Sequence, residues 1–589
     1  MPRFSDPATG VISRRTNLLA AAVALLALTG CTGDGQAADP ARLGAPTARP
    51  TSGEMSTAGS YLAGRFAQSQ RDLTAAADYV QRVLAADPDN PQLLRRAYFL
   101  TASEGRIAEA ESYARRIADG SGETALASLT LALADIKAGR FAESERHIAA
   151  IERNRINNLM SPLLRGWVKI GQANLGGGLE ALKPAGQEAG LAALFQMHAG
   201  FMNDLAGRNE AAEQSYQRAS QQAGEPSQRM IAAIGSFYER AGEAAKAEAL
   251  YRDFGQRDPE SGFVEAALAR LHKGTKPERS VRSPRDGIAE ALVDIAGALI
   301  DGRTADTALI YVRMALDLRP DLDVGYILLG EIMEAQGRNE PAAHAYRAVP
   351  TGSPYAWNAR LRLAVNLEAL GETDRAVREL QAMAAERPTA PDPLIRAGDI
   401  LRTKERYQDA LPFYDDAFKR IGTVEPRHWS LFYSRGIALE RAKQWLRAEA
   451  DFLRALELQP DQAYVLNYLG YSWVDRGEHL VRARVMIEKA VALRPRDGHI
   501  VDSLGWVLYR AGDFVGAVTH LERAVELRPQ DPVINDHLGD AYWQVGRRAE
   551  ARVQWRRALS LKPEPDVTSA IEDKLQHGLK PGAAPQRGG

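Results

Sequence analysis

The chain has a single cysteine, no excess of charge and few long apolar runs. Because Cys31 is the only cysteine in 589 residues, neither an intrachain disulfide nor a cysteine-based metal site can form. Lys and Arg number 74 against 75 Asp and Glu, so the bulk charge gives no attraction to nucleic acid. The apolar run at residues 18–28 is too short to span a bilayer comfortably.

Motifs that carry catalysis are also missing. The sequence has no glycine-rich phosphate loop and no HExxH metal motif. His520 and His537 lie in consecutive repeats, with Asp536 beside the second, a spacing more typical of ordinary helix residues than of metal ligands. We therefore expect no enzyme activity, no cofactor and no metal site.

What the chain does contain is a fixed repeat, clearest between Ala463 and Pro563. Each unit has a Gly, an Ala about a dozen residues later, a second Ala and then a Pro, and successive prolines lie 34 residues apart. This is the tetratricopeptide-repeat signature, in which each unit is a pair of helices. The members are Gly470, Gly505 and Gly539; Ala483, Ala517 and Ala551; Ala490, Ala524 and Ala558; and Pro495, Pro529 and Pro563.

The residue types explain the helix pair physically. Small residues let the two helices touch, while larger apolar residues fill the seam between them. Gly512 and Gly546 are placed where the first helix must end in a left-handed turn. Asp531 and Pro532 are typical of a helix N-cap and first helical position. We therefore expect Ala517 and Ala524 to lie at tight helix contacts.

The pattern divides the chain into segments. We predict an all-α, right-handed superhelical solenoid of about twelve to fourteen helix pairs. Two repeat blocks carry it, and the N-terminal block has the looser pattern, blurred between Ala173 and Gly190. The predicted segments are a signal peptide at 1–30, a lipidated Cys and tether at 31–56, a degenerate repeat block at 57–272, a basic Pro-containing linker at 273–286, a second block at 287–563, a capping helix at 564–580 and a disordered tail at 581–589.

The linker at 273–286 has two prolines, five basic residues and no apolar period. One interpretation is a solvated connector between the two blocks. The other is a basic hinge that contacts an acidic partner or lets one block move.

The first thirty residues are typical of an exported lipoprotein. Basic residues precede the apolar run, which is the right size for a secretory signal. The run ends in Leu28–Thr29–Gly30–Cys31, which resembles the lipobox of bacterial lipoproteins, where Cys31 would be the lipidated residue. Ser13–Leu18 also looks like a twin-arginine motif, so both export routes stay open. Thr32 follows the Cys instead of an inner-membrane retention Asp, which favours the outer membrane, with inner-membrane retention as the alternative.

The segment after Cys31 is rich in Gly, Ala, Pro, Thr and Ser, and we predict a flexible tether. A coil of this length places the folded body about 25–30 Å from the membrane on average.

The repeat phases also locate a binding surface. The first helix of each pair is expected to line the concave face, where aromatic and polar side chains would hold an extended or helical polypeptide. The alternative is that several of these side chains are buried between repeats. The predicted groove residues are Tyr433, Tyr464, Asn467, Tyr471, Asp502, Trp506, Tyr509, Asp536, Asp540 and Trp543.

The lipobox together with the motifs at Gly470–Tyr471, Asp502–Tyr509 and His537–Asp540 resembles the long tetratricopeptide lipoproteins of the proteobacterial cell envelope. One type is an outer-membrane adaptor that binds a periplasmic carboxy-terminal processing protease and presents peptidoglycan hydrolases to it. The resemblance implies a non-catalytic, lipid-anchored periplasmic scaffold that binds protein partners and no nucleic acid. The alternative function is a structural component of an envelope assembly or polysaccharide export machine.

Overall fold

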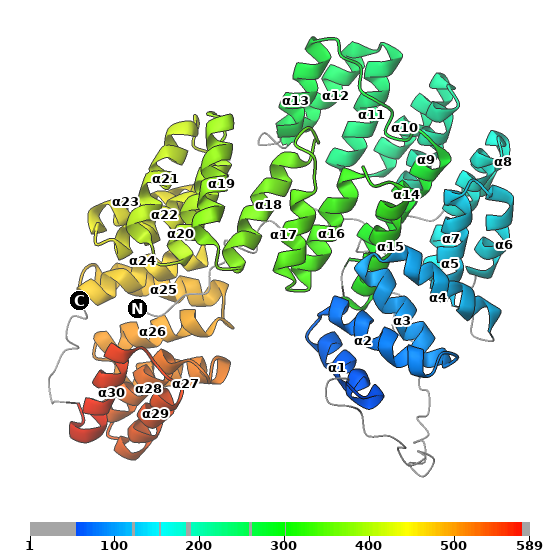
Figure 1. Ribbon diagram of the computed structural model, residues 1–589. Helices are drawn as coiled ribbons and strands as arrows, with labels where there is room; N and C mark the ends of the chain where they lie inside the picture. The colour runs from blue at the N-terminus through cyan, green and yellow to red at the C-terminus, as the bar shows by residue number, and fades with distance from the viewer. Residues whose placement is uncertain are drawn as a thin grey trace. The chain divides into compact units, whose positions relative to one another are not determined.

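The computed structural model describes residues 55–579, apart from 121–123, 152–154, 184–189, 258–261 and 301. These residues contain α-helices and no β-strand, which confirms the all-α tetratricopeptide fold (Figure 1). No helix among them is long and apolar enough to cross a membrane. The predicted signal peptide, Cys31, nearly all of the tether and the C-terminal tail lie outside the described residues.

The described helices pack into two compact units, residues 55–379 and 380–579. The N-terminal unit contains α1 Thr57–Ser69, α2 Leu73–Ala86, α3 Pro91–Glu104, α4 Ile107–Asp119, α5 Ala125–Lys137, α6 Phe141–Ile151, α7 Arg155–Gly171, α8 Leu175–Leu182, α9 Ala192–Leu205, α10 Asn209–Gln222, α11 Gln228–Ala241, α12 Ala244–Arg257, α13 Gly262–His272, α14 Pro284–Ala298, α15 Ala305–Leu318, α16 Asp323–Ala335, α17 Asn339–Arg347 and α18 Ala356–Ala369. Helix α19, Thr373–Glu386, spans the division.

The C-terminal unit continues the same alternation of first and second helices. It contains α20 Asp392–Thr403, α21 Tyr407–Arg420, α22 Trp429–Arg441, α23 Trp445–Leu458, α24 Ala463–Arg476, α25 Leu480–Leu493, α26 Gly498–Arg510, α27 Phe514–Leu527, α28 Pro532–Gln544, α29 Arg548–Ser560 and α30 Pro565–His577. Of the 30 helices in the described residues, α13 and α30 stand alone and the other 28 follow one another as 14 pairs. This number agrees with the twelve to fourteen pairs predicted from the repeat.

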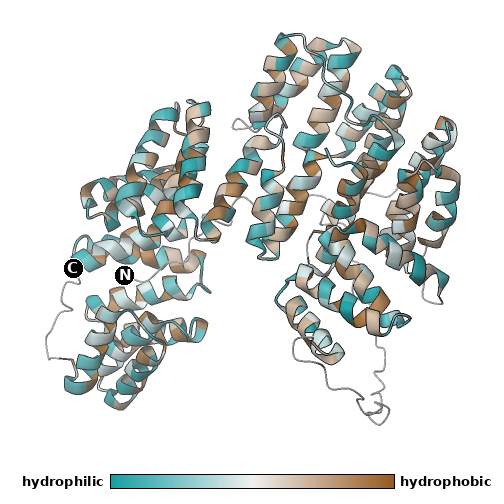
Figure 2. Ribbon diagram, in the orientation of Figure 1, coloured by the Kyte–Doolittle hydropathy of each residue, from teal (hydrophilic) through white to brown (hydrophobic). Residues whose placement is uncertain are grey.

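Glycine brings the two helices of a pair together, as the repeat predicts. A Cβ on Gly505 would lie 2.5 Å from Leu521 of the second helix, and one on Gly539 would lie 2.5 Å from the Trp555 ring. Ala517 and Ala524 are fully buried in the same seam. Figure 2 shows that individual helices carry both hydrophobic and hydrophilic residues, as expected for helices with one face in the core.

The predicted helix ends are also present. Gly512 and Gly546 have φ of 82° and 84°, the left-handed conformation that ends a first helix. The Asp531 carboxylate accepts hydrogen bonds from the backbone N–H groups of Val533 at 2.9 Å and Ile534 at 3.1 Å, and Pro532 begins α28.

The N-terminal unit departs from a simple solenoid at α14 and α15. A repeat in a solenoid contacts its neighbours in sequence. Here α14 packs against α7 and α9, and α15 packs against α3, α4 and α5. Accordingly, buried residues occur on every side of α14, from Asp286 to Ala296. The α14–α15 pair thus lies against the inner helices of the repeats that precede it (Figure 1).

Gly287 allows this packing. A Cβ at this position would lie 2.2 Å from the indole ring of Trp167 on α7, so only glycine lets the two helices approach this closely. The Trp167 side chain is fully buried against α14. Because Gly287 carries a hydrogen where alanine would carry a methyl group, α14 can pack this closely against α7.

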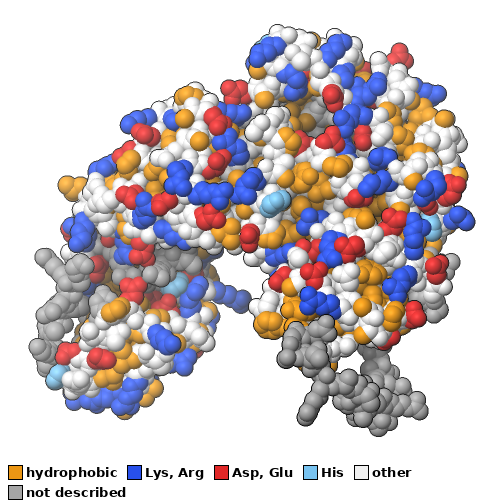
Figure 3. Space-filling model, viewed as in Figure 1, with side chains coloured by type: hydrophobic (Ala, Val, Ile, Leu, Met, Phe, Trp, Pro, Cys, Tyr) orange, Lys and Arg blue, Asp and Glu red, His pale blue; other side chains and the backbone are white. Residues whose placement is uncertain are grey.

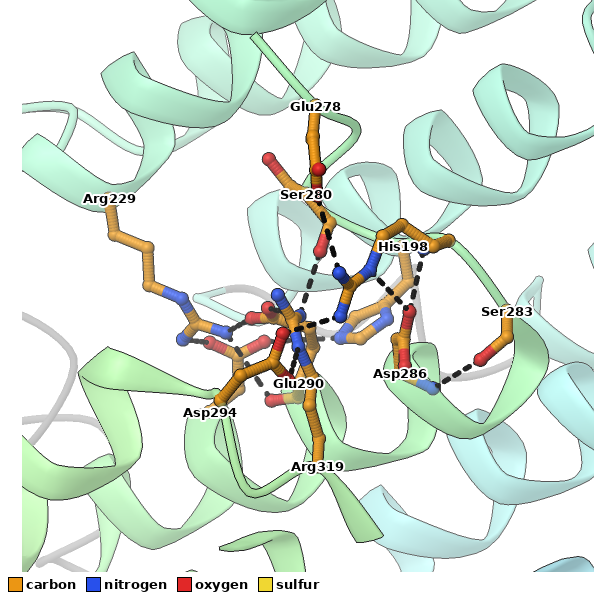
Figure 4. Close-up of polar contacts among 11 residues, drawn as sticks. His198, Arg229, Glu278, Ser280, Ser283, Asp286, Glu290, Asp294 and Arg319 are labelled. Atoms are coloured by element: carbon orange, nitrogen blue, oxygen red, sulfur yellow. Dashed lines mark hydrogen bonds and ion pairs between the residues drawn. The ribbon is translucent and has the colours of Figure 1, made fainter. Parts of the chain in front are cut away.

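Charged residues that are buried or half-buried complete the packing between α14 and its neighbours (Figure 4). Arg229 of α11 forms ion pairs with Glu290 and Asp294 of α14. Arg319 adds an ion pair of 2.9 Å to Glu290. Because every one of these charges has an opposite charge beside it, the network can be buried without unpaired ions.

A histidine on α9 extends this network to the tryptophan. His198 is fully buried, and its Nδ1 accepts a hydrogen bond from Trp167 Nε1 at 3.0 Å. With Nδ1 accepting, Nε2 carries the ring proton and donates to Asp294 Oδ2 at 3.1 Å. His198 therefore connects α7, α9 and α14 through two hydrogen bonds.

The predicted linker at 273–286 lies inside one compact unit. Residues 273–279 are mostly exposed, but Val281 is buried and the helices on both sides, α13 and α14, lie in the same compact unit. The segment therefore does not separate two blocks; the boundary between the compact units lies at 379/380 instead. The physical reason is that α14 packs back onto α7 and α9, which joins the helices on either side of the linker.

Basic side chains of this segment contact the protein itself. Arg279 pairs with Asp204 at 3.3 Å, and Arg282 pairs with Asp321 at 2.6 Å. Arg285 donates to the Lys137 carbonyl at 2.6 Å. The hinge interpretation paired these basic side chains with the acidic groups of a partner. Arg279 and Arg282 instead pair with carboxylates of this chain.

Candidate functional site

The predicted groove residues lie on α22, α24, α26 and α28, the first helices of four successive pairs in the C-terminal unit. Asn467, Asp502 and Asp536 occupy the same position in three consecutive repeats, 35 and 34 residues apart. Since neighbouring first helices contact each other, these equivalent positions form one row, which we name the first-helix row.

The second residue of the row, Asp502, has a partner inside the protein. Its carboxylate oxygens lie 3.0 and 3.1 Å from Nδ1 of His537 on the next first helix. The imidazole also stacks on the Trp506 indole, with ring centroids 4.0 Å apart and planes inclined by 15°. The Trp506 indole also stacks on the Tyr509 ring, with ring centroids 4.9 Å apart. Trp506 and Tyr509 therefore pack within and between repeats.

The third residue, Asp536, is neutralised by the last helix. Lys574 of α30 donates to Asp536 at 2.9 and 2.8 Å and to Asp540 at 2.8 Å. Asp540 also accepts a hydrogen bond of 2.9 Å from Trp555 Nε1. Ile571 on the same helix is fully buried. Thus α30 covers the carboxylates at the end of the row.

Burial and neighbouring charge shift the proton affinities in this part of the unit. Burial raises the pKa of Asp540, and the adjacent Lys574 ammonium opposes this shift. Burial alone would lower the pKa of His537, but the charge of Asp502 outweighs it, so the pKa of His537 is raised. The Asp502–His537 contact is therefore a charged pair over a wider pH range than a free histidine would allow.

The two outermost predicted aromatic residues also pack against the protein. Tyr433 is buried and meets Tyr468 of the next first helix edge-on at 6.0 Å. Trp543 lies 5.4 Å from Trp555, and a Cβ on Gly578 would be 2.1 Å from its ring. Tyr433 is therefore buried between repeats, whereas Trp543 is half-buried against the second helix of its own pair.

The first residue of the row, Asn467, differs from the two carboxylates. Its side chain is 2 % exposed, and its Oδ1 has no hydrogen-bond partner in the described part of the chain. A buried carbonyl without a donor costs about 1–3 kcal/mol. On the same helix Tyr464 is half-buried beneath the Arg494 guanidinium at 4.9 Å, and Tyr471 is buried.

Sequence reasoning missed the two residues that neutralise the row. The spacing of the histidines predicts an ordinary helix residue at His537, which instead pairs with Asp502, and it gives no role to Lys574. The 35-residue separation of Asp502 and His537 is one repeat, and this spacing is the signal that could have paired them. Lys574 lies outside the repeat, so the periodicity carries no information about it.

No group of three or more His, Cys, Asp and Glu side chains in the described residues is arranged to hold a metal ion. The carboxylates of the first-helix row are instead balanced by His537 and Lys574. Of the predicted groove residues only Tyr464 and Trp543 are half-buried rather than buried, so these two rings are what the arrangement presents to a partner.

Comparison with known proteins supports the repeat assignment. Residues 334–575 match the tetratricopeptide repeat family model. The TPR repeat-containing protein PA4667 of Pseudomonas aeruginosa is 29% identical over 201 residues, which is 34% of this chain and 33% of the relative. The match thus spans about one third of the length of this relative.

Solved structures align with this chain at low similarity. The Cut9–Hcn1 hetero-tetramer of APC/C aligns with a TM-score of 0.36 and 15% identity over 88% of this chain and 95% of its own. YrrB, described as a TPR protein with an unusual peptide-binding site, aligns with a TM-score of 0.27 and 18% identity over 33% of this chain and 97% of its own. Such distant likenesses bear on no function. Residues 334–575 thus match the tetratricopeptide repeat family, and the 14 helix pairs of the described residues have the arrangement that the repeat predicts.

Proposed function

We propose that this protein is a non-catalytic scaffold that binds protein partners through the first-helix row of its C-terminal unit. Tetratricopeptide repeats provide rigid surfaces on which polypeptides lie, and the chemistry belongs to what they bind. In the N-terminal unit the α14–α15 pair packs against inner helices of the preceding repeats. The C-terminal unit shows no such inserted pair in its described residues, so its row is the surface we assign to partners.

The observation that carries this proposal is Asn467. Of three equivalent polar positions, Asp502 is paired with His537 and Asp536 is paired with Lys574. Asn467 Oδ1 has no donor among the described residues. Because this oxygen is shielded from solvent, a bound polypeptide would reach it by inserting a donor beside the half-buried Tyr464 of the same helix, which would remove the cost of the unpaired carbonyl.

Location and partner complete the proposal. The lipobox and the resemblance to envelope lipoproteins support anchoring at Cys31 on the periplasmic side of the outer membrane. A periplasmic carboxy-terminal processing protease, with peptidoglycan hydrolases as its substrates, is the partner we propose. These assignments rest on the sequence and not on the geometry of the repeats.

The test of partner binding is a crosslinking pull-down from intact envelopes with Asn467→Ala. Because Asn467 Oδ1 has no partner to lose, the variant should keep wild-type melting. Loss of hydrogen bonds to the partner, each about 0.5–1.5 kcal/mol net, should reduce capture severalfold.

Asn203→Ala is the matched control for this experiment. Asn203 on α9 is similarly buried and its Oδ1 also has no partner among the described residues, but it lies in the N-terminal unit. The control should retain full capture. Equal capture by both variants would place the partner elsewhere.

Anchoring is tested separately with Cys31→Ser. The substitution removes the sulfur that would receive the lipid, so it should abolish lipid labelling and release the protein to the soluble periplasm. Unchanged fractionation with membranes would refute the lipoprotein assignment.

A further inference from the structure

The first helix of the described chain has two different apolar sides. Ser60, Gly64 and Ala67 are buried and face α2, the second helix of the same pair. Large apolar side chains on other positions of α1 and just before it face solvent. Their exposed fractions are 51% for Met55, 39% for Tyr61, 67% for Leu62 and 67% for Phe66.

These exposed residues lie together. Leu62 and Phe66 are spaced by four residues within α1, which brings them onto one side of the helix, and Met55 lies just before its N-cap Ser56. We name Met55, Tyr61, Leu62 and Phe66 the N-terminal face. Figure 3 shows hydrophobic side chains gathered over α1 and α2 at the lower end of the N-terminal unit.

At the C-terminal end of the repeats, the outer side of the last helix pair is covered by a further helix. There α30 packs against α29 with Ile571 fully buried. No helix in the described residues plays this part for α1. The preceding sequence, residues 32–54, contains Pro40, Pro46 and Pro50 and hardly any large apolar residue, a composition that does not favour an amphipathic helix.

We propose that the N-terminal face docks on the surface of an anionic phospholipid membrane. This inference rests on the proposed anchoring at Cys31, which lies 24 residues before Met55. A coil of that length holds α1 within about 25–30 Å of the bilayer on average. The anchor therefore raises the local concentration of lipid at α1 above that at any later helix.

The charges around the N-terminal face match such a surface. Arg65 is exposed and lies between Leu62 and Phe66 in sequence. The Arg96 guanidinium lies 5.8 Å from the centre of the Tyr61 ring. Within the described residues, neither arginine forms an ion pair. Burial, and then the like charge of Arg65, lowers the pKa of Arg96, so the face is locally positive.

The combination of aliphatic, aromatic and arginine side chains is that of a helix lying in a membrane interface. Aliphatic and aromatic groups enter the headgroup region, while arginines remain beside the lipid phosphates. A partner protein helix would use the apolar residues equally well. The tether and the arginines, which have no acidic partner among the described residues, favour the membrane.

The experiment is sedimentation of unacylated mature chain, residues 32–589, with phosphatidylethanolamine–phosphatidylglycerol vesicles. The wild-type chain should bind, and binding should weaken at high salt because the arginine contribution is screened. Leu62→Asp with Phe66→Asp should reduce the partition coefficient roughly tenfold or more, since two apolar groups are replaced by charges repelled by the surface. Because this chain carries no lipid, its result is independent of the Cys31→Ser test.

Val481→Asp with Val485→Asp is the matched control. These two residues have the same i, i+4 spacing on α25 and are 83% and 60% exposed, but they lie far from the tether in sequence. The control should bind vesicles like wild type, and both variants should retain wild-type helicity.

Three results would overturn the proposal. The first is a wild-type chain that does not bind these vesicles, and the second is equal loss of binding in the two double variants. The third is concentration-dependent dimerisation that Leu62→Asp with Phe66→Asp abolishes while vesicle binding stays unchanged, which would assign the N-terminal face to a second copy.

Discussion

Glycine residues, whose side chain is a single hydrogen atom, set how closely neighbouring helices pack against each other in this protein. Gly505 and Gly539 do so within helix pairs, and Gly287 does so between α14 and α7. The repeat spacing predicts the first two, because they recur every 34 residues. Gly287 has no counterpart in the period that indicates its contact with Trp167, since that contact joins helices distant in sequence.

We expect Gly287→Ala to destabilise the N-terminal unit by about 1–3 kcal/mol, because the new methyl group would overlap the Trp167 ring. Gly297→Ala on the same helix is the control. A Cβ there meets nothing within 4 Å, and the higher helix propensity of Ala should stabilise by about 0.5–1 kcal/mol. Denaturant titration measures both changes. A loss of stability in Gly297→Ala as large as that in Gly287→Ala would contradict the assigned packing.

The proton affinities in the C-terminal unit predict a pH dependence. The folded state raises the pKa of His537, so this group stabilises the fold fully below its unfolded pKa of about 6.5, and the contribution is lost as pH rises through the raised value. The raised pKa of Asp540 acts in the same direction at lower pH, between its ordinary value and the raised one. Wild type should therefore lose stability between mildly acidic and mildly alkaline pH.

Asp502→Asn tests the origin of this dependence. Without this carboxylate, burial is opposed only by the charges of Asp536 and Asp540, so the pKa of His537 should fall and the variant should lose much of the stabilisation at acidic pH. Denaturant midpoints of both proteins across this pH range give the comparison. Parallel curves for wild type and variant would show that the Asp502–His537 pair does not titrate as described.

At the scale of helices, α14 is the element that distinguishes this protein from a regular solenoid. Its ends and helical character follow from its sequence, because Ser283 caps it with a hydrogen bond of 3.2 Å and Pro284 begins it. The helices against which α14 packs cannot be predicted from its sequence. The periodic pattern describes contacts between neighbouring repeats, whereas α7 and α9 are separated from α14 by several helices. The basic segment before α14 therefore predicts a boundary between two blocks. In the structure the helix that follows it, α14, instead packs against α7 and α9.

Arg229→Met tests how strongly α14 is held. The substitution leaves the buried Glu290 and the neighbouring Asp294 without this cation, and loss of one partner of a buried pair costs about 3–5 kcal/mol. Because Arg229 itself is partly exposed, we expect the lower end of this range. Hydrogen exchange should show lost protection in α14.

The control for this substitution is Arg252→Met, which removes an exposed i, i+4 ion pair with Glu248 on α12. Such pairs contribute about 0–1 kcal/mol, so protection in α14 should not change. Wild-type exchange of α14 in Arg229→Met would mean that apolar packing alone holds this helix.

At the scale of the whole molecule, the repeats predict a binding scaffold but do not specify the binding residues. Nine of the ten predicted groove positions have partners inside the protein: Tyr433, Tyr464, Tyr471, Asp502, Trp506, Tyr509, Asp536, Asp540 and Trp543. Repeat phase locates a residue on the first helix, whereas its partner depends on the side chain that the next repeat presents. Asn467 is distinguished only by the partner that its Oδ1 lacks among the described residues.

Photo-crosslinking from a defined position tests the central claim most directly. A photoreactive phenylalanine derivative in place of the half-buried Tyr464 lies on the same helix as Asn467, and one in place of the exposed Val485 lies on a second helix. In intact envelopes, we expect a crosslinked protein partner from position 464 and none from position 485. Crosslinks from position 485 alone would show that partners bind another surface and would contradict the assignment of the first-helix row.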